Sequence, residues 1–225
     1  MTDLLDGMRV ENKTQSIETG ATKQAMSNEK PEARKYYQLG LDMGLPSAPL
    51  RIWVNEKKLK EGFPADARLP FHGFQFFEPP RIAFDRKNRR GPVRDADAIM
   101  LGIWLISDRL KLVLEQIDPD AFSFVRAEAD YTNFDEPGPA LWFCDIVRML
   151  DCIDEQHSVI RYQEDVPLKN YISLIDVRMR PEVVGSAHAF RLTYATLKQI
   201  VDDVFVSAIK KEKIKGFRFV DIQRV

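Results

Sequence analysis

The clearest pattern of hydrophobic and polar positions lies between residues 107 and 119. Four apolar residues there follow the i, i+3, i+4, i+7 spacing of one helix face: Leu110, Val113, Leu114 and Ile117. Ser107 can cap the first turn, and Asp108 suits the positive end of the helix dipole. Asp118-Pro119 ends the pattern, so the sequence predicts an amphipathic helix over residues 108–117.

Short runs rich in aromatic and β-branched residues predict strands before and after this helix. These runs are residues 35–39, 50–54, 122–125, 172–179, 189–192, 204–206 and 217–222. An aromatic segment from Phe71 to Phe77 is closed by Pro79-Pro80. Residues 193–201 place Tyr194, Leu197 and Val201 at helical spacing and predict a second helix.

The C-terminal part repeats the order of elements seen around the first helix. Ser207 is the expected cap of a short helix over residues 208–215, and Gly216 stands where a C′ residue should. This segment and the one around the first helix would then share one order of elements: a strand, a helix capped by Ser, a turn, and a strand that begins Phe-x-Phe-Val. The similarity indicates either a repeated supersecondary unit or a common βαβ-like solution that occurs twice, and both interpretations remain open.

Helices and strands alternate only locally along the chain. The expected fold class is therefore α+β, a mixed sheet with amphipathic helices in a single globular domain. Residues 11–33 contain no aromatic residue and no apolar period, so they cannot bury enough surface to offset the entropy of ordering. We expect residues 1–33 to form a flexible N-terminal tail and residues 34–225 to form the domain.

The segment from Trp142 to Glu155 has the most distinctive pattern. On a helix, its apolar residues would form one broad face: Phe143, Ile146, Val147, Leu150 and Ile153. Charged residues would line the other side, with Arg148 held between two aspartates: Asp145, Arg148, Asp151, Asp154 and Glu155. This polar stripe is either aimed at a partner or a network that keeps an apolar helix soluble. Spacing alone favours the network, but these five residues are the candidates for partner binding.

The overall charge gives no field that would attract nucleic acid or an anionic membrane. The chain has 33 basic and 34 acidic residues, a net charge of -1. Two basic clusters could contact phosphates, but they are expected to be a solvated loop and a solvated helix face: Arg86, Lys87, Arg89, Arg90 and Arg94, and Lys210, Lys211, Lys213 and Lys215. Nucleic acid is therefore an unlikely partner.

The sequence contains none of three kinds of short motif that are typical of catalytic or metal-binding sites. There is no Gly-x-Ser-x-Gly elbow, no phosphate-binding glycine loop, and no clustered His or Cys ligands. The segment Gly185–His188 is expected to be a turn. We expect no catalytic residue, no metal and no cofactor. Free thiols at Cys144 and Cys152, no export signal and no membrane-spanning run together predict a cytoplasmic protein.

Within roughly residues 100–225 the chain resembles a family of bacterial immunity proteins from polymorphic toxin systems, immunity family eleven. The specific part is the segment Pro139–Ser158 around Trp142-Phe143-Cys144-Asp145. Other matching segments are more generic: Leu105–Leu110, Phe190-Arg191-Leu192, Val204–Ser207 and Ile214–Phe219. Residues 1 to about 90 add little to the resemblance.

The resemblance implies an antidote that binds one cognate toxin and blocks it without catalysis. The toxin would be a secretion-system effector used in bacterial competition. A cytosolic antidote suits a nuclease or a nucleotide-targeting enzyme. One alternative is a regulatory protein that binds nucleic acid or a small ligand through the basic clusters. Another is an enzyme that uses Asp145, Asp151 and His157.

Overall fold

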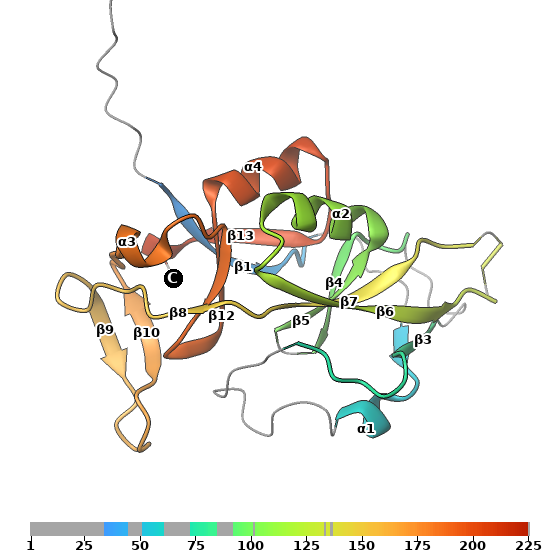
Figure 1. The fold of residues 1–225 in the computed structure, drawn as a ribbon, viewed down its shortest axis with the longest axis horizontal. Helices are drawn as coiled ribbons and strands as arrows, with labels where there is room; N and C mark the ends of the chain where they lie inside the picture. Colours follow the sequence, from blue (N-terminus) through green and yellow to red (C-terminus); the bar gives the residue numbers. More distant parts are fainter. Residues whose placement is uncertain are drawn as a thin grey trace, which may run out of the picture. The chain divides into compact units, whose positions relative to one another are not determined.

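Two β-sheets and a separate hairpin make up the part of the chain that the structure, a computed structural model, describes (Figure 1). That part comprises residues 34–44, 51–60, 73–84, 92–100, 102–132, 134–135 and 137–224. The expected tail over residues 1–33 lies outside it, as do four of the five residues of the first basic cluster. Residues 34–225 form one compact unit.

The larger sheet has six strands in the order β2-β3-β6-β7-β5-β4. Its strands are β2 (Arg51–Trp53), β3 (Arg81–Phe84), β4 (Ala96–Met100), β5 (Ile103–Ser107), β6 (Phe122–Asp130) and β7 (Leu141–Ile146). The β3–β6 pair is parallel and the other pairs are antiparallel. The sheet is therefore mixed, as expected.

The second sheet has five strands in the order β13-β1-β12-β11-β8. Its strands are β1 (Tyr36–Leu41), β8 (Met149–Leu150), β11 (Ala189–Leu192), β12 (Ala195–Asp202) and β13 (Phe217–Asp221). Only the β8–β11 pair is parallel. Four helices and a final 3-10 turn complete the described elements: α1 (Glu56–Leu59), α2 (Asp108–Ile117), α3 (Pro181–Val184), α4 (Asp203–Lys211) and Ile222–Arg224.

The hairpin consists of β9 (Val159–Tyr162) and β10 (Tyr171–Ile175). Its two arms continue towards the second sheet through a bridge between Ile153 and Met179. Two backbone bonds join the arms further, from Asp154 to the carbonyl of Arg178 (2.9 Å) and from Arg180 to that of Cys152 (2.7 Å). We call residues 151–182 the ribbon.

Three clusters of buried side chains lie between these layers. One cluster fills the space where α2 and α4 pack with residues of both sheets, and its largest fully buried member is Phe205. Another packs the inner face of the ribbon against β11 and β12, around Phe190. The third covers the other face of the six-stranded sheet with α1 and the aromatic segment, around Phe143. Both faces of the central strands are therefore buried.

The helix predicted over residues 108–117 is confirmed as α2. The Ser107 hydroxyl accepts a hydrogen bond from the Leu110 amide (3.2 Å), and Asp118 ends the helix. Leu110, Val113 and Leu114 are buried. The strands predicted at residues 35–39, 50–54, 122–125, 189–192 and 217–222 are confirmed, with small shifts at their ends.

The helix predicted over residues 142–155 is wrong. This segment is strand β7, the short strand β8 and the first arm of the ribbon. Strand β7 lies between β5 and β6 and sends Phe143 to one buried cluster and Ile146 to another. A strand buried on both faces shows no alternation of polar and apolar residues, so its short apolar run also fits a helical period.

The helix predicted at residues 193–201 is a strand in the structure, and the strand predicted at residues 204–206 is part of a helix. Residues 195–202 form β12, and helix α4 begins at Asp203. The N-cap is Asp202, whose carboxylate accepts from the Phe205 amide (2.9 Å), and not Ser207. Lys213 adopts the left-handed conformation after α4, with φ 54°. Gly216, with φ 125°, instead allows a close approach, because a Cβ there would lie 2.0 Å from the Ala96 carbonyl oxygen.

The two similar segments do share one topology. In each, a strand leads into a helix through its capping last residue, Ser107 or Asp202, and a parallel strand follows the helix. One antiparallel strand separates the two parallel strands: β7 between β5 and β6, and β1 between β12 and β13. The order of elements was thus recognisable, although the second unit begins earlier than the sequence indicated.

Candidate functional site

The first predicted site residue, Asp145, is buried at the end of β7 and does not face solvent. It forms an ion pair with Arg191 of β11. The Arg191 guanidinium also donates to three backbone carbonyls, those of Ile146 (2.6 Å), Thr196 (2.6 Å) and Gly102 (2.9 Å). Burial raises the pKa of Asp145 to about 6, although Arg191 opposes this shift. Asp145 therefore joins the two sheets.

Arg148 does not lie between Asp145 and Asp151, as the sequence indicated. It pairs with the buried Asp118 at the end of α2. The same Asp118 carboxylate accepts from the backbone amide of His188 (2.8 Å), at the start of β11. Arg148 and Asp118 thus form a second connection between α2 and the five-stranded sheet. Asp145 and Arg148 thus make structural contacts, and a role of either residue in partner binding stays a prediction.

The other three predicted residues, Asp151, Asp154 and Glu155, do come together. They line a groove of about 440 Å³ between the two arms at the base of the ribbon. The opposite arm contributes Arg180 and Glu182. Four carboxylates and one guanidinium therefore face this groove, and the surrounding surface is acidic. No local pattern in the sequence predicts that Glu182 lines this groove. It comes near Asp151 only because the two arms of the ribbon pair.

Asp151 and Glu182 are the most available acids of this groove. Asp151 is 47% exposed and lies 3.4 Å from Arg180, a distance too long for a strong ion pair. Glu182 is exposed at the start of α3. Asp154, in contrast, is held by His157, whose Nδ1 lies 2.7 Å from its carboxylate, and this hydrogen bond lowers the pKa of Asp154.

Glu155 holds the hairpin together. Its carboxylate accepts hydrogen bonds from the hydroxyls of Tyr171 (2.7 Å) and Tyr162 (2.9 Å) and pairs with Lys169. The Lys169 ammonium also lies over the ring of Tyr194, 4.2 Å from its centre. Hydrogen bonds from Lys169 and then from Tyr171 lower the pKa of Glu155 to about 2. One carboxylate thus orders both strands and the connecting loop.

Replacing Glu155 with glutamine should give a stability defect that depends on pH. The folded pKa of about 2 lies below the ordinary value of 4.5, so the charged carboxylate stabilises the fold above pH 4.5. That contribution is lost as the pH falls from 4.5 towards 2. In urea unfolding, we expect the stability gap between wild type and Glu155→Gln to narrow steadily below about pH 5. Glu164→Gln, an exposed position in the loop of the same hairpin, should show no such gap. A gap that stays constant with pH would contradict this role.

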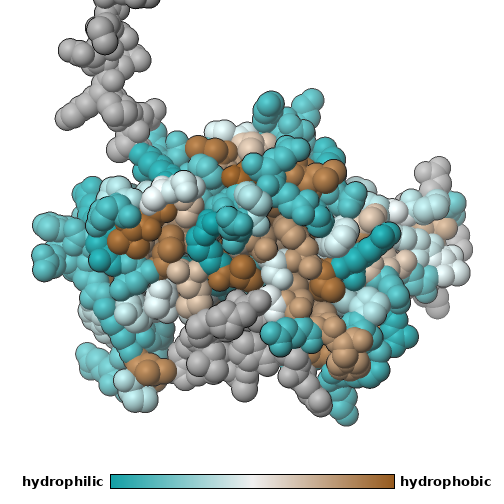
Figure 2. Space-filling view, viewed as in Figure 1, coloured by the Kyte–Doolittle hydropathy of each residue, from teal (hydrophilic) through white to brown (hydrophobic). Residues whose placement is uncertain are grey.

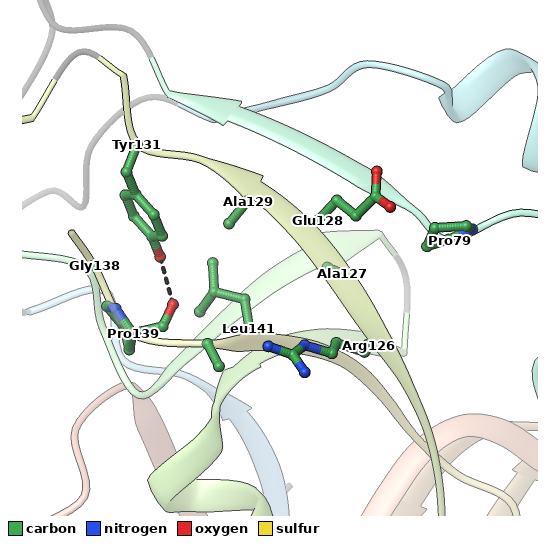
Figure 3. A pocket seen from close by; sticks show the side chains of 10 residues that line it. Pro79, Arg126, Ala127, Glu128, Ala129, Tyr131, Gly138, Pro139 and Leu141 are labelled. Carbon is green, nitrogen blue, oxygen red and sulfur yellow. Dashed lines mark hydrogen bonds between the residues drawn. The ribbon is translucent and has the colours of Figure 1, made fainter.

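A second hollow, of about 690 Å³, opens where β6 and β7 diverge (Figure 3). Tyr131 points across it and donates a hydrogen bond to the carbonyl of Pro139 (2.8 Å). Its ring packs so closely on Gly138 that a Cβ there would lie 2.2 Å away. The described lining residues include Arg126 and Glu128 but no Ser, Cys or His. Its described titratable groups are thus one guanidinium, one carboxylate and the Tyr131 phenol, which already donates to Pro139.

The residues proposed for an enzyme are each engaged in other contacts. Asp145 pairs with Arg191, Asp151 neighbours Arg180, and His157 contacts Asp154. His188 lies with its Nδ1 2.8 Å from Asp202, the buried cap of α4. Both cysteines are buried and free, and burial raises the pKa of each thiol, that of Cys152 to about 12. Neither thiol is therefore poised as a nucleophile.

Within the described residues, no group of three or more His, Cys, Asp or Glu side chains could hold a metal ion. None of the helices described is long and apolar enough to cross a membrane. The second basic cluster, at the end of α4, is exposed to solvent: Lys210, Lys211, Lys213 and Lys215. The first basic cluster lies mostly outside the described residues.

A family model described as the immunity protein family Imm11 matches residues 30–224. The chain belongs to this family. The resemblance noted from the sequence is confirmed, and it extends beyond residues 100–225 over the first part of the domain as well. No curated protein matches the chain. Membership of Imm11 indicates a protein that neutralises a toxin.

Proposed function

We propose that this protein is a stoichiometric inhibitor that binds one cognate toxin in the cytosol and blocks it without catalysis. The observation that carries the proposal is the family match over nearly the whole chain. The engagement of Asp145, His157 and both cysteines in structural contacts supports a binding role over an enzymatic one. Two buried free thiols are compatible with a reducing compartment.

The acidic groove is the proposed contact surface. Asp151, Asp154 and Glu155 stay candidates for partner binding, and Glu182 joins them. We infer that the partner presents a basic surface, as nucleases do, since they bind phosphates. Acidic side chains opposite such a surface speed encounter and select the partner. Because the hydrogen bonds of Asp154 and Glu155 hold the ribbon in place, the groove keeps its shape before binding.

The proposal predicts protection from the toxin domain encoded in the neighbouring reading frame. Expression of that domain should arrest growth of a host that lacks this protein, and co-expression of this chain should restore growth. The two proteins should co-purify as an equimolar complex. Rescue without a complex would contradict inhibition by binding and would favour an enzyme that reverses the damage.

A further inference from the structure

The hairpin exposes aliphatic side chains to solvent. Val159, Ile172 and Ile175 are 57%, 50% and 54% exposed. A strand with one face packed on a core normally places polar residues on its other face. The inner face here is already occupied, because Tyr171 and Leu174 are buried against the five-stranded sheet. The fold therefore gives the three outer side chains no partner within the described residues.

Two of these side chains are direct neighbours. Val159 and Ile175 are cross-strand partners. A register shift between Tyr171 and Ser173 makes Ile172 an extra residue in β10, and such bulges redirect a side chain. The Arg161–Ser173 pair lies between this bulge and the Val159–Ile175 pair. Leu168, in the connecting loop, is also 55% exposed, and hydrophobic atoms are visible at the lower end of the hairpin (Figure 2).

These side chains lie next to the acidic groove. Glu155 lines the groove and at the same time binds Tyr162 and Tyr171, one from each strand of the hairpin. The groove and the aliphatic side chains thus belong to one ribbon, and the Val159–Ile175 pair is at the end of the hairpin nearest the groove. Stable interfaces have a similar anatomy, in which a few apolar anchors are desolvated and charged groups surround them.

We propose that the outer face of the β9–β10 hairpin, formed by Val159, Ile172 and Ile175, is the apolar centre of the toxin-binding interface. Its occupant is the cognate toxin, which presents an apolar patch flanked by basic side chains that reach Asp151 and Glu182. This inference rests on the proposed function. It assigns different effects to two neighbouring parts of the ribbon: apolar contacts slow dissociation, and the acidic groove speeds association.

The test compares two sets of substitutions for binding to the purified toxin domain of the neighbouring reading frame. Val159→Thr with Ile175→Thr removes the apolar pair but keeps β-branched side chains, so the strands should stay formed. Leu112→Gln with Val204→Thr is the control, because these aliphatic side chains on α2 and α4 are also about half exposed (53% and 48%). We expect the hairpin variant to lose at least about tenfold in affinity, mainly through faster dissociation. The control should bind like wild type.

The outcomes separate this inference from the proposed function. If the wild-type protein itself does not bind the toxin domain, the proposed function fails. If wild type and hairpin variant bind equally well, the hairpin inference fails and the function stands. Light scattering of the protein alone supplies a second readout. A wild-type dimer that the hairpin substitutions convert to a monomer would overturn the inference, because a second copy would then occupy this face. Circular dichroism must show the folded spectrum for both variants.

Discussion

Replacing Asp145 with alanine should lower the free energy of unfolding by about 3–5 kcal/mol, because it leaves the Arg191 charge buried without its partner. Arg191 would keep three carbonyl acceptors, but no anion would balance it. Removing both charges, with Asp145→Leu and Arg191→Met, should recover much of this loss. Urea unfolding of the wild type and of both variants measures these changes.

The matched control is Asp151→Ala, which removes a carboxylate from an exposed and loose pair with Arg180. Its effect on stability should stay below about 1 kcal/mol. A loss of similar size for both alanine variants would show that Asp145 does not join the sheets as described. A negligible loss for Asp145→Ala would return this residue to the candidates for partner contact.

Reversing the two available charges of the groove, with Asp151→Lys and Glu182→Lys, should weaken toxin binding by about a hundredfold. The loss of two close charge pairs at an interface accounts for a change of this size in the dissociation constant. The reversed charges also repel the basic partner. Stability should change little, since both side chains are exposed and neither carries a strong ion pair in the described structure. Titration calorimetry at physiological salt measures the affinity.

The control for this reversal changes the net charge by the same amount elsewhere. Asp120→Lys with Glu212→Lys substitutes two exposed acids outside the groove. If it weakens binding equally, the effect is a general one of net charge and the groove is not the contact surface. The substitution Glu155→Lys would be a poor test, because it would also break the hydrogen bonds that hold the hairpin.

The sequence was most informative where an element has one buried and one exposed face. Helix α2 is such a case, and its cap, its bounds and its buried side chains were all predictable. The prediction for residues 142–155 was wrong because β7 is buried on both faces. Such a strand lacks the alternation of polar and apolar residues by which a strand is recognised. The sequence does contain a start signal for α4. Asp202 is a typical N-cap residue, and Phe205, Val206 and Ile209 follow it at helical spacing and are buried.

The candidate site was predictable only in part, for a related reason. The charges between residues 145 and 155 were predicted to form one stripe on a helix. Because this segment is a strand and one arm of the ribbon, these side chains point to different places in the structure. Asp145 and Arg148 pair with Arg191 and Asp118, which are distant in sequence and carry no local signal. Asp151, Asp154 and Glu155 remain together because they are close in sequence on one arm of the ribbon. Their partners on the other arm depend on strand pairing, which spacing cannot reveal.

The most direct test of the central claim is a titration of the toxin's own activity with this protein. Toxin at a fixed concentration, well above the dissociation constant, is mixed with increasing amounts of the wild-type chain, and the remaining activity is recorded. Stoichiometric inhibition predicts a linear fall to zero that ends at one molecule of this protein for each molecule of toxin. Loss of activity at far lower ratios, growing with incubation time, would contradict the account and reveal a catalyst.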